Sequence, residues 1–312
     1  MELWDYARLS EDELILRINK ARAERNAVIL AHNYQRLQIQ DIADFLGDSL
    51  QLAKKATRVD ADVIVFCGVM FMAEVAAILN PDKTVLIPEI QAGCPLAAGA
   101  TAEDIIQLKR KYPDFVVVTY VNSTAETKAV SDITCTSSNS VEVINSFPPH
   151  RGIIFVPDKN LCRYAKLQSG RDNIICWDSN CYVHDRLTIQ DLKQAKSKYP
   201  DATIIVHPEC PPDVQDAADF IFSTGGMYKY AKEHQDETIV LGTEIGLIER
   251  IRNEFPKVKV YPMSEKAICS NMKLITLPKV ARSLEQNMYK VEVPENVAQR
   301  AKMAIEQMLE VK

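Results

Sequence analysis

Helical patterns and apolar runs alternate along the chain, and the same order of segments occurs three times. Each copy opens with a helical pattern that starts at a hydroxyl residue followed three positions later by an acid, which is a signature of a helix start. The pattern then leads into an apolar run of strand length that ends in polar residues. These helix-then-strand segments begin at Ser10, Thr101 and Thr188, and the last two both contain Lys-Tyr-Pro-Asp.

The three copies stay in register beyond the first strand. The first strands end in ILAHNY, VVTYVN and IIVHPE, so His32 aligns with Tyr120 and His207 at spacings of 88 and 87 residues. The next segments end at Ser49, Ser137 and Thr224, with the same two spacings. A third strand follows in each copy (DVIVFCGV, GIIFVPD, TIVLGTE), and then a fourth short run (TVLIP, NIICW, VKVYP).

Strands that alternate with helices predict largely parallel sheets. We predict an α/β fold of three pseudo-threefold-related αβα-sandwich units, with short parallel sheets around a central cavity. The predicted units are residues 1–94, 95–181 and 182–271. Residues 272–312 form a tail, in which a proline near a helix start and a later apolar stripe predict helices that pack back onto the body.

The composition is ordinary for a globular protein, with 47% hydrophobic and 25% charged residues and a net charge of −5. No basic block stands out, so no nucleic-acid partner is expected. Residues 1–26 carry acids among apolar positions, which predicts an amphipathic helix and not a secretory signal. No apolar run approaches the roughly 20 residues of a membrane helix, so we expect a cytoplasmic protein without a membrane partner.

Eight cysteines occur in this chain, and without a secretion signal reduced thiols or metal ligands are favoured over disulfides. Cys94, Cys181 and Cys269 each follow the fourth run of a copy, at spacings of 87 and 88 residues, which predicts a shared metal centre. Zinc would need a fourth ligand, which His184 could supply. Three thiolates on a [4Fe–4S] cluster would leave one iron open, and this is the favoured alternative.

The other candidate residues follow the ends of strands, where parallel α/β sheets bind their ligands. Ser49, Ser137 and Thr224 stand before helical patterns, so they are either helix caps or parts of an anion site. The acid–base candidates are a second set. We expect Glu209 to have a raised pKa in a closed cavity and to serve as the base. The full acid–base set is His32, Tyr34, Tyr120, His207 and Glu209.

Many ordered motifs resemble the quinolinate synthase family of the NadA type. They are ILAHNYQ, DIADFLGDSL, FMAE, LNPDK, YVNSTAETKA, TSSNSVEV, PDKNL, HPEC, STGGM, GTEIGL and CSNMK, and they run from about residue 20 to the end of the chain. The resemblance implies three homologous α/β units around a [4Fe–4S] cluster held by Cys94, Cys181 and Cys269. It also implies that the open iron acts as a Lewis acid on the substrate.

The resemblance further implies a transferase of de novo NAD synthesis. Its substrates would be iminosuccinate (iminoaspartate), supplied by an aspartate-oxidising enzyme, and dihydroxyacetone phosphate. Its products would be quinolinate, phosphate and two waters. By motif, Tyr34 matches a catalytic tyrosine, and Val121 and Pro208 would act through backbone or shape. The family's binding positions map onto His32, Ser49, Tyr120, Val121, Asn122, Ser137, His207, Pro208, Glu209 and Thr224.

Two other functions remain open from the residues themselves. One is another cluster-dependent hydro-lyase, which would dehydrate a hydroxy acid without a triose phosphate. The other is a sensor that binds a small diacid through zinc or a cluster. His207 and Glu209 favour an enzyme over a sensor, because an imidazole and a carboxylate two residues apart suit acid–base chemistry.

Overall fold

The computed structural model describes residues 1–311, and within this range it contains three four-stranded parallel sheets. One sheet falls in each repeated copy, so the predicted α/β fold class is confirmed. The chain divides into two compact units. The first unit is Met1–Cys94 with Cys269–Ala298, and the second is Pro95–Ile268 with the chain from Gln299. The division into domains 1–94, 95–181 and 182–271 stays a prediction.

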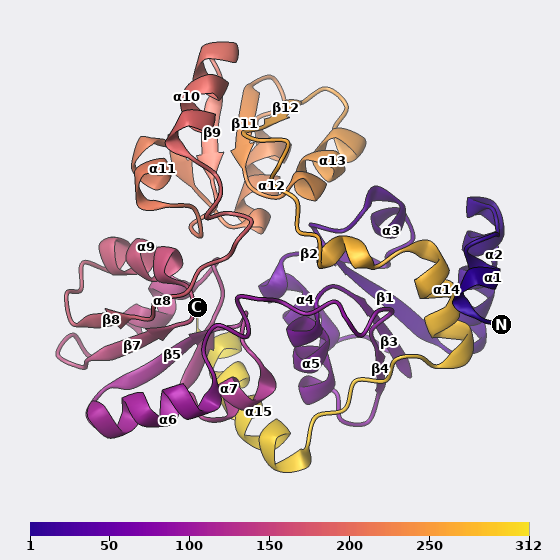
Figure 1. Ribbon diagram of the computed structural model, residues 1–312, viewed down its shortest axis with the longest axis horizontal. Coiled ribbons are helices and arrows are strands. Elements are labelled where there is room, and N and C mark those ends of the chain that lie inside the picture. Colours follow the sequence, from indigo (N-terminus) through magenta and orange to yellow (C-terminus); the bar gives the residue numbers. More distant parts are fainter. Residues whose placement is uncertain (312) are drawn as a thin grey trace. The chain divides into compact units, whose positions relative to one another are not determined.

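The first unit contains one sheet with the strand order β2-β1-β3-β4. Helices α4 and α5 lie on one face of this sheet, and α2 and α14 lie on the other (Figure 1). The strands are β1 (Ala27–His32), β2 (Phe45–Gly47), β3 (Val63–Cys67) and β4 (Thr84–Leu86). The helices are α1 (Leu3–Tyr6), α2 (Glu11–Glu24), α3 (Leu37–Asp41), α4 (Ser49–Ala56), α5 (Met70–Leu79), the 3-10 helix η1 (Met272–Leu274) and α14 (Leu277–Gln286).

The second unit contains two sheets, with the orders β6-β5-β7-β8 and β10-β9-β11-β12. Their strands are β5 (Val116–Tyr120), β6 (Ile133–Cys135), β7 (Ile153–Val156), β8 (Ile174–Cys176), β9 (Thr203–Val206), β10 (Phe220–Ile221), β11 (Thr238–Gly242) and β12 (Lys259–Pro262). The helices are α6 (Ala102–Lys111), α7 (Ala125–Ala129), α8 (Ser140–Asn145), α9 (Lys159–Ser169), α10 (Ile189–Lys198), α11 (Pro212–Ala217), α12 (Thr224–Glu233) and α13 (Ile245–Glu254).

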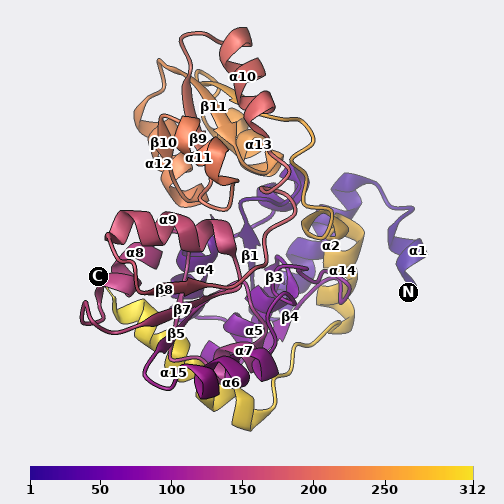
Figure 2. The ribbon, with the colours of Figure 1, turned by 60° about the vertical axis from the view of Figure 1, so that its left-hand side comes forward.

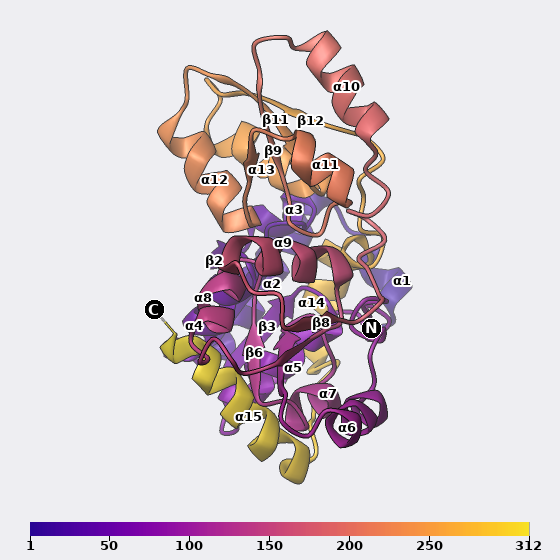
Figure 3. The same cartoon turned by 90° about the vertical axis from the view of Figure 1, so that its left-hand side faces the viewer.

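Helices cover both faces of each sheet in the second unit, as parallel sheets require. Helices α8 and α9 lie on one face of the β5–β8 sheet, and α6 and α7 lie on the other (Figure 2). Helices α10 and α11 face α12 and α13 across the β9–β12 sheet (Figure 3). Helix α15 (Glu295–Glu310) runs along β6, where the Thr134 hydroxyl donates to the Ala304 carbonyl at 3.3 Å.

The N-terminal segment differs from the prediction of one amphipathic helix, because it forms the separate helices α1 and α2. Ser10 breaks the run by capping α2. Its hydroxyl accepts from the Glu13 N–H at 3.3 Å, while the Glu13 carboxylate accepts from the Ser10 N–H at 2.8 Å. This reciprocal capping satisfies two N–H groups that a continuous helix would have paired internally.

A repeated aspartate sets the start of the second strand in every copy. Asp44, Asp132 and Asp219 stand just before β2, β6 and β10. Each carboxylate accepts a backbone N–H from the first strand of its sheet, and each aspartate N–H donates to the carbonyl of that same residue. The carboxylate contacts are Ile29 N to Asp44 at 2.7 Å, Val117 N to Asp132 at 2.7 Å and Ile204 N to Asp219 at 2.8 Å. The repeat therefore preserves strand register as well as strand order.

Candidate functional site

The strongest chemical cluster of the second unit lies where the β5–β8 and β9–β12 sheets end. Glu209 follows β9, whereas Cys181 and His184 lie on the loop after β8. Their ligand atoms all lie within 4.8 Å of one another. A thiolate, an imidazole and a carboxylate at such distances could hold a metal ion.

Glu209 is buried and surrounded by polar side chains. Its carboxylate lies 2.6 Å from His184 Nδ1 and 3.5 Å from His207 Nδ1, and Asn122 Nδ2 donates to it at 3.5 Å. Burial alone would raise the pKa of Glu209, but His184 and His207, with a hydrogen bond from Tyr120, outweigh burial and lower the pKa to about 2. The expected raised pKa is therefore wrong, and Glu209 is a carboxylate at neutral pH.

His184 is fixed on both of its ring nitrogens. Nδ1 faces Glu209 and also lies 3.4 Å from the Cys181 sulfur, while Nε2 lies 3.0 Å from the Thr243 hydroxyl. The ring stacks on His207 with centroids 4.4 Å apart. The sequence suggested His184 only as a zinc ligand and did not reveal its contact with Glu209, because α10 and β9 separate the two residues along the chain.

Asp158 and Asn160, which sequence reasoning did not single out, stand beneath this cluster at the start of α9. Asp158 is 0% exposed, and its carboxylate accepts from the Leu161 N–H at 2.8 Å and from the Cys181 N–H at 3.0 Å. Burial first, and then the charge of Glu209, raise the pKa of Asp158 well above its usual value. The available signal was the polar run Asp-Lys-Asn that follows Pro157 after the fully buried strand β7.

Tyr120, Val121 and Asn122 end β5 on the same side of the second unit. Tyr120 pairs with Cys135 in the sheet register, and the Val121 N–H donates to the Cys135 carbonyl at 2.7 Å. The Asn122 Oδ1 atom is buried and has no hydrogen-bond partner in residues 1–311. A buried acceptor left open beside Glu209 fits a site that takes a polar ligand.

The three aligned hydroxyl residues are not helix caps, so that interpretation is wrong. Asp48 caps α4 and Ser223 caps α12, which makes Ser49 and Thr224 the first residues of their helices. Ser137 lies three residues before α8. In the second unit the Ser138 hydroxyl donates to the Ser223 hydroxyl at 2.9 Å, which brings the neighbourhoods of Ser137 and Thr224 together.

Hydrogen bonds from Gln215 hold the backbone of the turn that contains His207 and Glu209. Pro208 is buried, and its carbonyl accepts from the Gln215 side-chain amide at 2.8 Å. The same amide also donates to the Cys210 carbonyl at 2.8 Å. Because these bonds use only backbone carbonyls, Pro208 shapes the turn and leaves the flanking side chains to face the site.

In the first unit, His32 and Tyr34 follow β1 and are both buried. Their rings meet edge to face with centroids 4.7 Å apart. The Lys273 ammonium donates to the Tyr34 carbonyl at 2.7 Å, and the Lys273 N–H donates to the Cys269 carbonyl at 3.2 Å. His32 also pairs with Gly47 in the sheet register, two residues before Ser49. This unit thus gathers its own candidate residues at the carboxyl edge of its sheet.

The cysteines fall into classes that differ in exposure. Cys94, Cys181 and Cys269 are half-buried, whereas Cys67, Cys135 and Cys210 are buried. Burial raises the pKa of each of the buried thiols, so these groups are poor metal ligands. Cys94, Cys181 and Cys269 thus lack the burial that disfavours the thiolate form of the other three.

Two other cysteines, Cys162 on α9 and Cys176 on β8, form a disulfide across a sequence separation of 14 residues. The prediction of reduced thiols or metal ligands is therefore wrong for this pair. The remaining predicted thiols do not enter a disulfide within the part of the chain that the structure describes.

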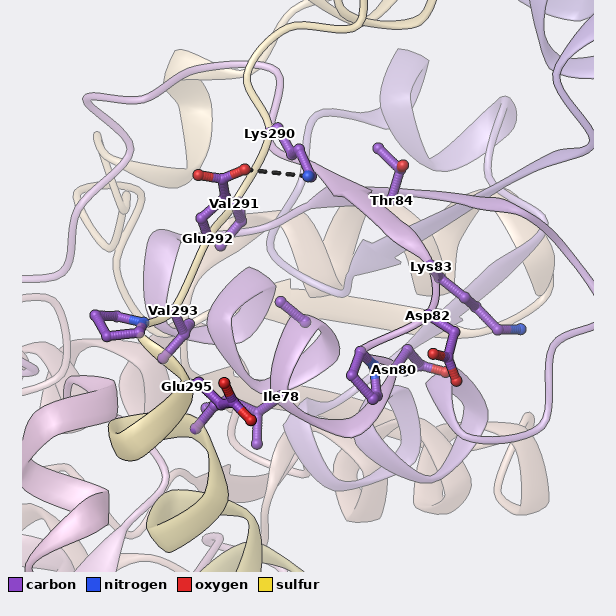
Figure 4. Close-up of a pocket in the computed structure, with 14 residues that line it drawn as sticks. Ile78, Asn80, Asp82, Lys83, Thr84, Lys290, Val291, Glu292, Val293 and Glu295 are labelled. Carbon is purple, nitrogen blue, oxygen red and sulfur yellow. Dashed lines mark ion pairs between the residues drawn. The ribbon is translucent and has the colours of Figure 1, made fainter.

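The first unit also contains a cavity of about 670 Å³, and none of the candidate site residues lines it (Figure 4). It borders Thr84, the first residue of β4, and so lies at the amino edge of the sheet. Its wall includes an ion pair between Lys290 and Glu292 at 3.0 Å, both of them exposed. No histidine or cysteine occurs among its lining residues, so the candidate site stays at the carboxyl edge.

Across residues 1–311, no helix combines the length and apolar character needed to cross a membrane. A family model described as "Quinolinate synthetase A protein" matches residues 16–310. The chain is 53% identical over 300 residues to the quinolinate synthase of Pyrococcus abyssi, covering 96% of this chain and 99% of that protein.

Two further relatives with the same name are similar over nearly their whole length. The chain is 50% identical to the protein of Thermococcus kodakarensis, covering 97% of this chain and 100% of that one. It is 47% identical to the protein of Thermodesulfovibrio yellowstonii, covering 95% and 97%. With a family match that includes every candidate residue described above, the chain belongs to the quinolinate synthase family.

Proposed function

We propose that this quinolinate synthase condenses iminosuccinate with dihydroxyacetone phosphate to quinolinate, releasing phosphate and water, in de novo NAD synthesis. The observation that carries the proposal is the family match over residues 16–310 combined with three half-buried cysteines in repeat register. Supply of iminosuccinate by an aspartate-oxidising enzyme and a cytoplasmic location stay predictions.

We assign Cys94, Cys181 and Cys269 as the ligands of a [4Fe–4S] cluster. Their shared register and exposure support a site with one thiolate from each copy. When bound, such a cluster supplies an open iron position that polarises a substrate oxygen. Zinc at Cys181, His184 and Glu209 is the competing assignment. That assignment leaves the other two cysteines in register without a role, so it is less favoured.

Proton transfer in the proposed reaction falls to the residues around Glu209. Since its pKa is about 2, Glu209 holds little affinity for a proton by itself. The carboxylate instead orients His184 through the 2.6 Å contact, as a carboxylate does for a catalytic imidazole. Both ring nitrogens of His184 are engaged, so Glu209 stays the assigned proton acceptor, and it would take up a proton once substrate displaces one of its histidine contacts.

The other candidates would bind and orient substrate. Tyr34 and His32 are assigned as proton donors to substrate oxygens, and Tyr120 and His207 as orienting residues. Asn122 offers an open amide oxygen to a substrate hydroxyl or amine. Ser49 and Thr224, as first residues of α4 and α12, present hydroxyl groups where helix N–H groups and dipoles favour phosphate or carboxylate.

The test is anaerobic purification with iron, sulfide and zinc analysis, followed by an assay with both substrates. We expect about four irons and four sulfides per chain. Alanine at Cys94, Cys181 or Cys269 should abolish the cluster, and Cys67→Ala is the matched control because Cys67 is buried away from the repeat register.

Two outcomes would replace the proposal with a different function. Stoichiometric zinc without iron would favour the sensor. A bound cluster that dehydrates a hydroxy acid but forms no quinolinate from the substrate pair would favour the hydro-lyase.

A further inference from the structure

Each of the three cysteine loops is anchored by the helix that follows the third strand of its copy. The first backbone N–H of that helix donates to the carbonyl of the residue two positions before the cysteine. The bonds are Met70 N to Ala92 O at 2.8 Å, Lys159 N to Ser179 O at 2.8 Å and Ile245 N to Ala267 O at 3.0 Å. Because this hydrogen bond recurs at the same point of every copy, it belongs to the backbone structure that the copies share.

The second copy adds a side-chain bond to this anchor. Asp158 is the N-cap of α9, and while one carboxylate oxygen caps the helix, the other accepts the N–H of Cys181 itself. The corresponding N-cap positions hold Val69 in the first copy and Glu244 in the third. Val69 has no polar side-chain atom, so the first copy cannot make the same bond.

The same turn of α9 also holds the loop that carries Glu209. The Asn160 side-chain amide donates to the Glu209 carbonyl and to the Asp185 carboxylate, both at 3.0 Å. Asp158 and Asn160, two residues apart at one helix start, therefore connect the backbones of Cys181 and Glu209. A shift of this helix start would move both residues.

We propose that Asp158 is a positioning residue for Cys181, which holds the backbone of this cysteine so that its thiolate is placed before any metal group is bound. This inference rests on the proposed role of Cys181 as a ligand. Preorganisation of a ligand reduces the ordering that binding must otherwise supply, and outer groups of this kind tune how firmly a metal centre is held.

The decisive variant is Asp158→Ser. Serine is as good an N-cap as aspartate, so α9 keeps its cap, but the shorter side chain cannot reach the Cys181 N–H. Asp158→Asn is the second variant in case serine disturbs folding, since it keeps the shape of the side chain. Asp178→Asn is the matched control, because Asp178 lies on the same loop, is 87% exposed and pairs with Lys159 on the surface.

Two readouts are taken, and the first uses the metal-free protein. Amide hydrogen exchange of residues 179–183 should become about tenfold faster in Asp158→Ser, the effect expected for one lost hydrogen bond to a carboxylate. The melting temperature of the metal-free protein should stay close to that of the wild type. The second readout is the rate of iron release to a chelator under anaerobic conditions, which should rise by a similar factor.

Unchanged exchange at 179–183 in both Asp158 variants, or an equal change in Asp178→Asn, would overturn the inference. Faster exchange without faster iron release would also overturn it, because the backbone would then be mobile without consequence for the metal. If the wild type binds no iron but exchange still responds to Asp158, the hold on Cys181 is real and the cluster assignment is what fails.

Discussion

In the turn after β1, the Tyr34 N–H donates to His32 Nδ1 at 3.2 Å, and in the turn after β9, the Glu209 N–H donates to His207 Nδ1 at 3.3 Å. The next bonds agree as well, because the third residue after each histidine donates its N–H to the histidine carbonyl at 3.0 Å in both turns. The two turns thus have the same backbone frame and differ in the side chain that the frame presents.

A buried amide supports each frame from the helix that follows it. Gln40 donates to the carbonyls of Asn33 at 3.3 Å and Gln35 at 2.9 Å. Gln215 does the same for the third copy. In the middle copy the Lys128 ammonium donates to the Ser123 carbonyl. The copies therefore keep a donor at this position, even where the residue type changes.

This comparison shows how one frame supports different chemistry. In both turns a backbone N–H contacts histidine Nδ1, which leaves Nε2 as the ring nitrogen available to a ligand. Two residues later the first copy presents the phenol of Tyr34, whereas the third presents the carboxylate of Glu209. The repeated backbone supplies the geometry, and the different side chain at one position supplies a different proton affinity.

The largest expected effect is a difference in kcat between variants of Glu209 and Tyr34. Glu209→Gln keeps the shape and the frame but removes the assigned proton acceptor, so kcat should fall roughly 10²–10⁴-fold. Tyr34→Phe should lower kcat less, because water can replace a single proton donor. Steady-state quinolinate formation, measured beside the iron content, checks both. Near-normal turnover of Glu209→Gln with a full iron content would show that Glu209 only binds.

The next effect tests whether the frames are equivalent. Gln40→Met and Gln215→Met should each lower the free energy of unfolding by about 1–3 kcal/mol for every buried carbonyl left unpaired. The control is Gln107→Met, since Gln107 is exposed and its side-chain amide donates to Glu103 on its own helix at 3.3 Å.

Urea unfolding followed by tryptophan fluorescence measures these changes, since Trp4 lies in the first unit and Trp177 in the second. A large loss for one glutamine variant and none for the other would mean that the two turns do not share a frame.

A smaller effect compares the helix starts of the same two copies. Ser49→Ala and Thr224→Val should each weaken binding of the phosphate or carboxylate groups by about 1–3 kcal/mol, if the hydroxyl bonds to a charged group. Because Asp48 and Ser223 still cap the helices, thermal stability should hardly change. KM for each substrate identifies which copy binds which anion, and unchanged KM and kcat in both variants would place the anion site elsewhere.

The smallest effect concerns pH and is confined to the first unit. Burial alone would raise the pKa of Glu285, but hydrogen bonds from Arg17 and Tyr6 outweigh it and lower the pKa. A lowered carboxyl pKa stabilises the fold above the usual value of about 4.3 and loses this contribution as the pH falls through the folded value.

The difference in stability between wild type and Glu285→Gln should therefore be constant near neutral pH and shrink in acid. Trp4 fluorescence in a Trp177→Phe background reports it. A difference that persists at pH 2 would show that packing, and not charge, is responsible.

The sequence predicted the sheets well because an apolar strand pattern is local and was present three times. It could not decide which of two neighbouring polar residues caps a helix. Asp48 and Ser49 both have side chains that suit an N-cap. In the structure β2 ends at Gly47, so Asp48 takes the N-cap position and its side chain accepts from the Gln51 N–H at 2.8 Å.

The errors at Glu209 and at the disulfide have a different origin. The pKa of Glu209 depends on His184, which lies 25 residues earlier in the chain, so the immediate neighbours of Glu209 in sequence predict the opposite shift. The Cys162–Cys176 bond depends on α9 packing beside β8, a proximity that no spacing of cysteines reveals. Pairwise contacts between elements were thus the information that the sequence pattern lacked.

The return of residues 269–298 to the first unit also constrains how a ribosome can deliver this protein. The Ile87 and Tyr289 backbones exchange hydrogen bonds at 2.9 and 3.1 Å, and the Arg25 side chain donates to the Leu284 carbonyl. The second unit's two sheets are synthesised between these partners. All four strands of the first sheet therefore emerge early, but the face that α14 covers stays uncovered during translation until nearly the whole chain has left the exit tunnel.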